Sequence, residues 1–207
     1  MNLDKFIGEQ VKHPRGMFSG VIAQRMNQSN VDINKNTIQL LEIEPTDRVL
    51  EIGFGGGDGL NEMTKLIQSG LLAGIEISDD MIKLSRKRFK DFISQGKLEL
   101  KKGSSKEIPY EDGFFDRVCV INCIYFWSDP LADLREIMRV MKNEGKLVLS
   151  AYTEEMKQKF SFSRRGYIFY SESQVQYFLD EAGFKDISFE HRECQEVEAV
   201  FSIGTKR

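Results

Sequence analysis

The sequence predicts a doubly wound α/β domain, in which a mostly parallel sheet carries helices on both faces. Three observations indicate this fold class. Short apolar runs alternate with segments of helical apolar spacing across residues 48–204. A glycine-rich turn, residues 53–59, follows the first apolar run and precedes a helical pattern. The chain has 207 residues, a length that suits one domain with a sizeable core better than two.

The composition is ordinary for a soluble globular protein, with 41% hydrophobic and 29% charged residues. The net charge of −3 gives no general indication of nucleic-acid or membrane binding. The basic segment at residues 83–90 lacks interleaved aromatics on the same face, so we interpret it as a solvated helix face. No apolar run approaches the ~20 residues of a membrane span, and residues 1–5 show no signal-peptide core. The three Cys are too scattered for a disulfide framework. We therefore expect a reduced, cytoplasmic protein.

An N-terminal segment, residues 1–45, precedes the domain. Residues 13–16 (His-Pro-Arg-Gly) break regular structure, and residues 32–43 are predicted to form a helix. Pro45 ends that helix, because the residue before a proline is displaced from the α region. We expect the segment to be a helical lid over the domain formed by residues 46–207; simple packing against that domain is the alternative.

The first strand and the helix after it frame the glycine-rich turn. Residues 49–52 form an apolar run that is too short for a helix and is stopped abruptly by glycines. Five of the seven turn residues, 53–59, are Gly, which lets the backbone adopt positive φ and approach a ligand closely. A helix with one apolar face follows and ends at Gly70. The turn therefore places backbone N–H groups at the carboxyl edge of the sheet, where open α/β folds bind ligands.

The glycine spacing separates two kinds of cofactor. A dinucleotide-binding turn needs the pattern G-x-G-x-x-G/A, and no register of this turn provides it. The pattern that is present, Glu51-x-Gly53-x-Gly55-x-Gly57, resembles motif I of the class I S-adenosylmethionine-dependent methyltransferases. A carboxylate at a strand end also suits a cofactor that carries an ammonium and a sulfonium. We expect these four residues to contact S-adenosyl-L-methionine; a tight turn that binds nothing is the alternative.

The second predicted strand, residues 71–77, ends with another acid. Glu76 follows the glycine turn by about 20 residues, where adenosine-cofactor folds place an acid on the ribose hydroxyls. The family resemblance implies the same role, and an exposed strand-end acid is the alternative. Ser78 is a predicted cap for the next helix. We include the neighbouring Ile77 and Met81 among the cofactor-contacting candidates.

The third predicted strand, residues 97–102, alternates polar and apolar residues. Gly103, Ser104 and Ser105 follow it. In the methyltransferase family this turn approaches the adenine and usually carries an acid after the Gly, whereas Ser104 stands at that place here. A hydroxyl can still hydrogen-bond the adenine amino group. We therefore expect these three residues to contact the cofactor.

The fourth predicted strand covers residues 117–122, and residues 109–116 before it resemble the segment that leads into this strand in the family. Asn122, at its end, is a further cofactor candidate. On a strand, Cys119 and Cys123 share a face, but their Cα atoms would lie ~13 Å apart. That separation is too large for a shared metal ion or a disulfide, so we predict no metal site and interpret both as small buried residues.

Three consecutive aromatics, Tyr125, Phe126 and Trp127, follow the fourth strand and can form a wall of the acceptor pocket; core packing is the alternative. Residues 122–125 retain the ends of the Asn-Pro-Pro-Tyr motif of amino-group methylases but lack both prolines. This departure argues against adenine or glutamine amides as acceptors. His13 could reach the site from the lid, although a surface His beside a Pro is the other interpretation. We assign no catalytic residue.

The remaining elements complete the sheet. They are a helix from Asp129, a strand at residues 146–151, a helix from Ser171 to Gly183, and strands at residues 184–191 and 197–204. Gln174 completes a capping box with Ser171. Residues 153–168 have few periodic apolar positions, and we expect them to cover the acceptor site. The family resemblance adds a Rossmann-like topology of seven strands, of which the last is antiparallel.

Together these patterns predict an S-adenosylmethionine-dependent methyltransferase that acts on a small molecule and is similar to the ubiquinone/menaquinone-biosynthesis type. We expect no nucleic-acid or membrane partner. A non-catalytic cofactor-binding regulator is one alternative, and it would lack an open acceptor pocket. A nicotinamide-dependent oxidoreductase is a second, which the glycine spacing disfavours. The sequence leaves open the acceptor, the methylated atom (O, N, C or S) and the oligomeric state.

Overall fold

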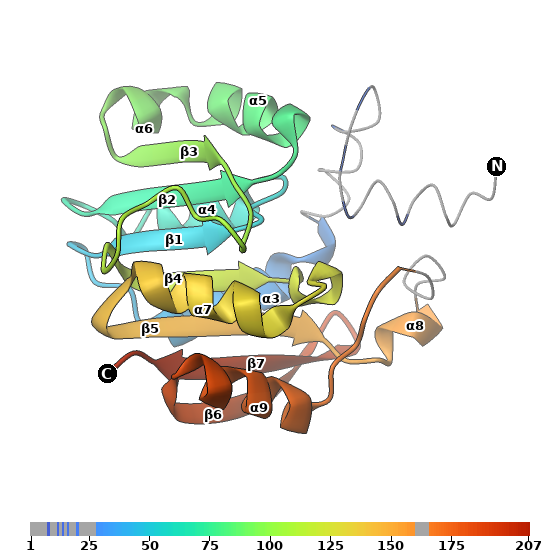
Figure 1. Cartoon of the computed structure of the whole chain (residues 1–207). Coiled ribbons are helices and arrows are strands. Elements are labelled where there is room, and N and C mark those ends of the chain that lie inside the picture. Colours follow the sequence, from blue (N-terminus) through green and yellow to red (C-terminus); the bar gives the residue numbers. More distant parts are fainter. Residues whose placement is uncertain are drawn as a thin grey trace.

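The computed structural model describes residues 28–159 and 166–207, together with residues 8, 12, 14, 16 and 20. The described part contains a seven-stranded sheet with the order β3-β2-β1-β4-β5-β7-β6, and helices cover both of its faces (Figure 1). Helices α3 and α4 pack on one face, and α7 and α9 pack on the other. The doubly wound α/β prediction is confirmed.

Most of the sheet is parallel. The strands are β1 Arg48–Ile52, β2 Leu71–Glu76, β3 Leu98–Lys102, β4 Phe115–Ile121, β5 Met141–Tyr152, β6 Lys185–Cys194 and β7 Val197–Thr205. β1 pairs in parallel with β2 and β4, and the parallel pairs β2–β3 and β4–β5 extend the sheet. β7 is antiparallel to both β5 and β6, as the family resemblance implied.

The described helices are α3 Val31–Leu41, α4 Asp58–Met63, α5 Asp79–Arg88, α6 Lys90–Ser94, α7 Pro130–Val140, α8 Met156–Lys159, α9 Glu172–Ala182 and the 3₁₀ helix η2 Ile124–Phe126. Three of them, α5, α7 and α9, begin where the sequence predicted a helix start. Ser78 Oγ accepts from the Met81 N–H at the start of α5, and Asp129 caps α7. Ser171 and Gln174 form the predicted capping box of α9. Within the described residues, none of these helices has the length and apolar character that crossing a bilayer requires.

α4 is shorter than predicted. Its apolar spacing predicted a helix that continues to Gly70, but the helix ends at Met63. The backbone N–H groups of residues 68–70 all donate instead to the carbonyl of Pro45. This contact folds the segment back onto the loop before β1, which satisfies its polar groups without further helical turns.

β4 also differs from the prediction. It ends at Ile121, because Asn122 adopts a left-handed φ of 55° and leaves the strand. Cys123 therefore lies in the turn after β4, and the expectation that it shares a strand face with Cys119 is wrong. Cys119 is fully buried, whereas Cys123 is half-buried.

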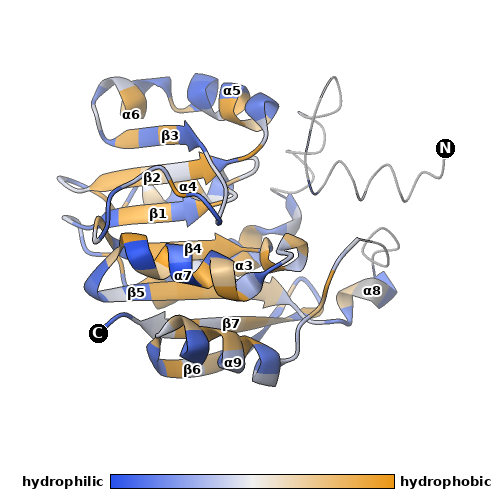
Figure 2. Ribbon diagram, in the orientation of Figure 1, coloured by the Kyte–Doolittle hydropathy of each residue, from blue (hydrophilic) through white to orange (hydrophobic). Residues whose placement is uncertain are grey.

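Apolar side chains form two buried cores, one on each face of the sheet. Figure 2 shows the central strands coloured largely as hydrophobic. Neighbouring residues of β1 point to opposite faces, so Val49 joins one core and Leu50 the other. Ile33 of α3 belongs to the first core, and Leu134 of α7 belongs to the second. Burial on both faces explains why the central strands read as continuous apolar runs.

β3 and β6 are the edge strands of the described sheet. β6 carries a run of charged residues, and its register with β7 shifts between Lys185 and Ser188. Asp186, within this bulge, has a φ of 51°.

Candidate active site

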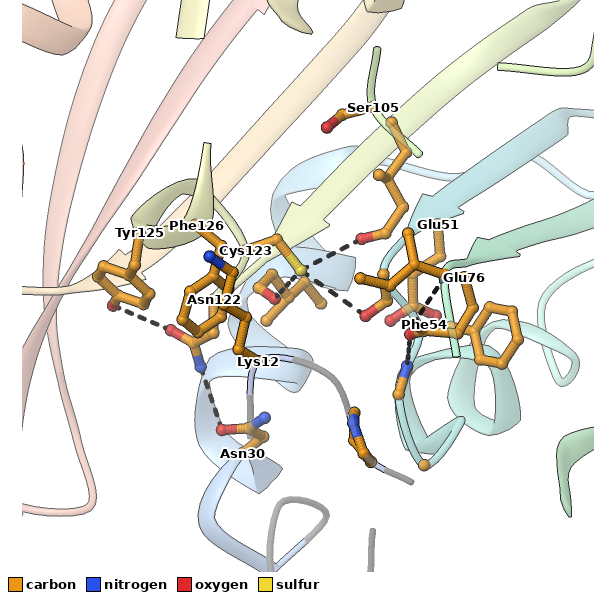
Figure 3. Close-up of a pocket in the computed structure, with 18 of the residues that line it drawn as sticks. Lys12, Asn30, Glu51, Phe54, Glu76, Ser105, Asn122, Cys123, Tyr125 and Phe126 are labelled. Carbon is orange, nitrogen blue, oxygen red and sulfur yellow. Dashed lines mark hydrogen bonds between the residues drawn. The ribbon is translucent and has the colours of Figure 1, made fainter. Parts of the chain in front are cut away.

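A cavity of about 710 Å³ lies at the carboxyl ends of the parallel strands (Figure 3). This is the edge at which doubly wound sheets bind ligands, because successive β–α turns converge there. Most of the predicted site residues line it: Glu51, Gly53, Gly55, Glu76, Ile77, Gly103, Ser104, Ser105, Asn122, Tyr125, Phe126 and Trp127. Two predicted residues, Gly57 and Met81, do not line it, and His13 lies outside the described residues.

Gly57 and Met81 lie behind the cavity wall. Gly57 precedes α4 with a φ of 79°, and a β-carbon there would meet the Phe89 ring at 2.8 Å. Met81 is fully buried, and its N–H donates to Ser78 at the start of α5. Both residues therefore shape the packing that supports the site, and neither contributes to the surface of the cavity.

Glu51, at the end of β1, is a buried acid with an open oxygen. Only 4% of the residue is exposed. The Leu60 N–H of α4 donates to its carboxylate, while Oε2 has no hydrogen-bond partner among the described residues. Burial, and then the nearby charge of Glu76, raise the pKa of Glu51 to about 8. A cationic ligand group would relieve this desolvation.

Glu76 connects the end of β2 to the glycine turn. Its Oε1 accepts from the N–H groups of Ile77 at 2.8 Å and Ser78 at 3.0 Å, and its Oε2 accepts from the Gly55 N–H at 3.1 Å. The residue is 6% exposed, so the alternative of an exposed strand-end acid is wrong. These bonds fix the carboxylate at the cavity wall.

Side chains from other elements brace the glycine turn. Gly53 has a φ of 73°, and Cys123 Sγ fills the space that a β-carbon there would need. Arg88 of α5 donates to the carbonyl of Gly56 at 2.9 Å and pairs with Asp58 at 2.6 Å. The turn is therefore held from the β4 side and from the α5 side.

Two described residues of the N-terminal segment are bound to the first turn of α5. Ser78 Oγ donates to the carbonyl of Pro14, which is buried. The Gly16 N–H donates to Asp80 Oδ2 at 2.7 Å. Lys12 and Pro14 both line the cavity. The segment thus reaches the same strand end that carries Glu76.

A chain of polar contacts closes the opposite end of the cavity. Asn122 Nδ2 donates to Asn30 Oδ1 at 3.1 Å, and Tyr125 OH lies 3.2 Å from Asn122 Oδ1. Tyr152 OH donates to the carbonyl of Ser29 at 2.9 Å. The Asn122 side chain thus connects the end of β4 to Asn30 of the N-terminal segment.

Aromatic rings form the wall at this end. The ring centres of Tyr125 and Phe126 lie 6.1 Å apart, and Tyr167 packs 5.3 Å from Tyr125 and 4.8 Å from Phe126. Tyr167 is placed here because the N–H of the next residue, Ile168, donates to the Tyr125 carbonyl at 3.0 Å. Lys12 Nζ lies 5.9 Å from the centre of the Phe126 ring.

Comparison with known proteins agrees with this geometry. The Methyltransferase domain family matches residues 50–149. An uncharacterized methyltransferase, YdaC of Bacillus subtilis (strain 168), is 29% identical over 194 residues, which are 92% of this chain and 98% of that protein. The ubiquinone/menaquinone biosynthesis C-methyltransferase UbiE of Citrifermentans bemidjiense is 29% identical over 156 residues, which are 71% of this chain and 66% of that protein. A solved structure of Haemonchus contortus phosphoethanolamine N-methyltransferase 2 in complex with S-adenosyl-L-methionine superposes with a TM-score of 0.77 at 16% identity, over 97% of this chain and 60% of that chain.

The matched region contains the glycine turn, Glu76 and the turn after β3. The chain is an S-adenosylmethionine-dependent methyltransferase. The matched domain and the relatives confirm the predicted cofactor, S-adenosyl-L-methionine, and the similarity to the ubiquinone/menaquinone-biosynthesis type. The nicotinamide-dependent alternative is rejected.

Several residues that line the cavity of this methyltransferase were not predicted. They are Lys12, Pro14, Gln28, Ser29, Asn30, Asn34, Ile52, Phe54, Gly56, Asp58, Gly59, Lys106, Ile121, Cys123, Asp133, Tyr152, Met156, Tyr167 and Gln195. Those of the glycine turn could have been found from their position between the motif residues. The others lie at strand ends, in helices and in loops. Those from residues 12–34 belong to the segment expected to be a lid, and Met156 and Tyr167 belong to the segment expected to cover the acceptor site, but no local pattern marks the individual residues.

Proposed function

We propose that this methyltransferase transfers a methyl group from S-adenosyl-L-methionine to a small-molecule acceptor, and that the cavity binds both. The observation that carries the proposal is the composition of the cavity, which has buried carboxylates, Glu51 and Glu76, at one end and aromatic rings at the other. Its size of about 710 Å³ falls within the range of small-molecule sites, about 300–1,000 Å³.

The groups at the ends of β1 and β2 fit the cofactor. The open oxygen of Glu51 would accept a hydrogen bond from the ammonium group, and ionisation of this acid beside a cation is favourable. Glu76, already fixed by backbone N–H groups, would bind the ribose hydroxyls. Gly53 and Gly55 would let the backbone approach the ligand closely. When bound, the cofactor supplies an electrophilic methyl group on its sulfonium.

The protein's part in the reaction is to position the acceptor and to exclude water. The acceptor atom must lie in line with the methyl group at ~3–3.5 Å. Burial raises the pKa values of Tyr125, Tyr167 and Cys123 well above their ordinary values. All three side chains therefore stay protonated near neutral pH, and none of them can act as a general base.

Among the described residues, the carboxylates that line the cavity are Glu51, Asp58, Glu76 and Asp133. Asp58 pairs with Arg88 and Asp133 accepts from Ser105, while Glu51 and Glu76 are assigned here to the cofactor. We therefore propose a nucleophile that needs no base from the described residues.

An electron-rich ring carbon meets this requirement, because its π electrons would form the new C–C bond while the bond between the methyl group and sulfur breaks and S-adenosylhomocysteine leaves. The ring proton at that carbon would then be lost to water, so the step needs no base from the described residues. The relatives named UbiE are C-methyltransferases of ubiquinone and menaquinone biosynthesis, and a planar ring would stack on Phe126 and Tyr167. We propose a planar ring acceptor that is methylated at carbon.

A turnover assay tests the proposed function. The purified protein is incubated with S-adenosyl-L-methionine and single acceptors drawn from hydroquinones, phenols, amines and thiols. S-Adenosylhomocysteine formation and the mass of the acceptor are measured. We expect turnover with hydroquinones and a carbon-bound methyl group. Cofactor binding without turnover of any acceptor would favour the non-catalytic regulator, and turnover of amines alone would reject the ring acceptor.

We further propose that residues 1–45 form a lid segment over the domain formed by residues 46–207, in which α3 anchors the segment to the core through Ile33 and Leu41 and the part before α3 covers the cavity. The bonds of Pro14 and Gly16 to the start of α5 support this proposal. The contact of Asn30 with Asn122 supports it at the other end of the cavity.

A further inference from the structure

Asn34 is a buried amide in the cavity wall to which the proposed reaction gives no role. It lies on the buried face of α3 together with Ile33, Thr37 and Leu41, and only 7% of the residue is exposed. The residue lines the cavity. Its backbone N–H donates to the Asn30 carbonyl at 2.9 Å, whereas its side-chain amide bonds to none of the described residues. A polar group in such a wall is satisfied only by what occupies the cavity, which points to a ligand.

The asparagines closest to Asn34 along the chain are engaged with other side chains. Asn30 Oδ1 accepts from Asn122 Nδ2 at 3.1 Å, and Figure 3 shows these two amides facing each other. Asn36, on the same helix as Asn34, accepts from Arg192 Nη1 at 2.9 Å. Asn34 differs from both, because its amide is open to the cavity.

The position of α3 indicates which ligand reaches Asn34. One turn before it, the Asn30 side chain contacts the turn after β4. One turn after it, Thr37 Oγ1 lies 2.7 Å from Ser150 Oγ, near the end of β5. The order β2-β1-β4-β5 places both of these strand ends on the far side of β1 from Glu76. The aromatic wall follows β4 at this same end of the cavity, so the ligand that reaches Asn34 is the acceptor.

The polar groups at this end favour a hydroxyl on the acceptor. An asparagine amide offers two N–H donors and one carbonyl acceptor. Lys12 Nζ, 5.9 Å from the centre of the Phe126 ring, adds further donors. Tyr125 OH is already bonded to the Tyr152 carbonyl at 3.0 Å. A hydroxyl both accepts and donates, so it suits this set, whereas an ammonium group would meet N–H donors and the charge of Lys12.

We propose that Asn34 binds a hydroxyl on the planar ring of the acceptor and is a specificity-determining residue of this methyltransferase. The bond fixes the ring in its plane, and so decides which ring carbon faces the methyl group. A ring that lacks the hydroxyl fits the aromatic wall but leaves the amide unpaired, so it is selected against. The inference rests on the proposed function, because it takes the ligand at the aromatic end to be the acceptor.

Ligand-observed NMR in the presence of saturating S-adenosylhomocysteine tests this proposal with two probes of similar shape. Phenol carries the hydroxyl, and toluene carries a methyl group in its place. Asn34→Leu removes the amide at nearly constant volume. We expect this change to lower the ratio of phenol affinity to toluene affinity by about 3- to 10-fold, the range for an uncharged hydrogen bond. The kcat/KM for a hydroquinone should fall by at least the same factor.

A matched control on the same helix separates this role from a structural one. Asn36→Leu makes the same change at a residue that does not line the cavity and that bonds to Cys194 and Arg192. It should lower the thermal stability and leave the affinity ratio intact. Ligand-free Asn34→Leu should be at least as stable as the natural protein, because it loses an amide that bonds to none of the described residues. Its affinity for S-adenosylhomocysteine should not change.

The proposal is wrong if Asn34→Leu leaves the affinity ratio unchanged, because the amide then binds only water. It is also wrong if the variant binds S-adenosylhomocysteine more weakly, since Asn34 then contacts the cofactor, or if it loses stability as Asn36→Leu does. Failure of both probes to bind the natural protein would overturn it as well.

The turnover assay keeps this inference distinct from the proposed function. Turnover of hydroquinones that Asn34→Leu does not affect would overturn the role of Asn34 and leave the proposed function standing. Absence of turnover with every acceptor would overturn the proposed function, and the affinity ratio would still decide whether Asn34 binds a ring hydroxyl.

Discussion

The carboxylate of Glu51 lies directly against the Cα of Gly59. A β-carbon at residue 59 would stand 2.5 Å from Glu51 Oε1 and 2.9 Å from the carboxyl carbon. The glycine in the first turn of α4 is therefore what gives the acid its place in the site. Only displacement of one of the two side chains would relieve such a contact.

Gly59→Ala should weaken binding of S-adenosylhomocysteine and lower the stability of the ligand-free protein, because the new methyl group displaces Glu51. In a Glu51→Ala background the same change should be neutral or stabilising, since Ala favours a helix over Gly by about 1 kcal/mol. Chemical unfolding of the natural protein, the two single variants and the double variant gives the interaction energy between residues 51 and 59. If Gly59→Ala lowers the free energy of unfolding equally in both backgrounds, the contact with Glu51 is not the cause of the loss.

Glu51 should also make the stability depend on pH. Its folded pKa of about 8 is higher than the unfolded value of about 4.3. The folded state therefore favours the protonated acid, so stability is fully present below pH 4.3 and is lost progressively as the pH rises to about 8. Glu51→Gln should remove this loss and be more stable than the natural ligand-free protein at pH 9, by on the order of a few kcal/mol.

Urea unfolding between pH 5 and 9 measures this difference, and the exposed Glu44→Gln is the control. Binding of the cationic cofactor should release a proton near pH 7, because the ionised form of Glu51 pairs with the ammonium group. Calorimetry in buffers of different ionisation enthalpy detects that proton. A stability difference that stays constant with pH would show that Glu51 does not titrate in this range.

Glu76→Ala should affect both binding and folding. Loss of the ribose acceptor should weaken cofactor binding by about 1.5–3 kcal/mol, the range for charged hydrogen bonds. The ligand-free protein should also lose about 1–3 kcal/mol, because the N–H groups of Gly55, Ile77 and Ser78 lose their acceptor. From the sequence alone, one would expect almost no change in stability without cofactor. Calorimetry and urea unfolding separate the two effects, and unchanged affinity would assign Glu76 a purely structural role.

Removal of the N-terminal segment should separate folding from function. Deletion should stop before residue 28, because Ile33 and Leu41 of α3 belong to the core. The protein that lacks residues 1–27 should fold, bind the cofactor weakly and transfer methyl groups poorly. In the intact chain, hydrogen exchange at residues 10–30 should slow when cofactor is added. If the cofactor does not change hydrogen exchange at these residues, and the shortened protein binds the cofactor as tightly as the intact chain, the segment only packs against the domain.

The sequence carries most of the information about the strands and the cofactor end of the site. Apolar runs, caps and the glycine spacing are local, and they located Glu51 and Glu76 correctly at the cavity. Tyr167, Asn30 and Asp133 could not be found in this way, because each reaches the cavity through contacts with residues far away in the chain. The end of α4 was mispredicted for the same reason, since the distant Pro45 carbonyl accepts the N–H groups of residues 68–70.

The bulge and the charged residues of the edge strand β6 affect the tendency of the protein to aggregate at high concentration. An edge strand exposes unpaired backbone groups that a strand of a second molecule could extend. The shift between Lys185 and Ser188 and the left-handed Asp186 interrupt the regular spacing that such an extension needs. Charged side chains of both signs along the rest of the strand would lose hydration against a second strand, which opposes its approach. This end of the sheet is thus protected against intermolecular β-sheet growth, a common first step of aggregation.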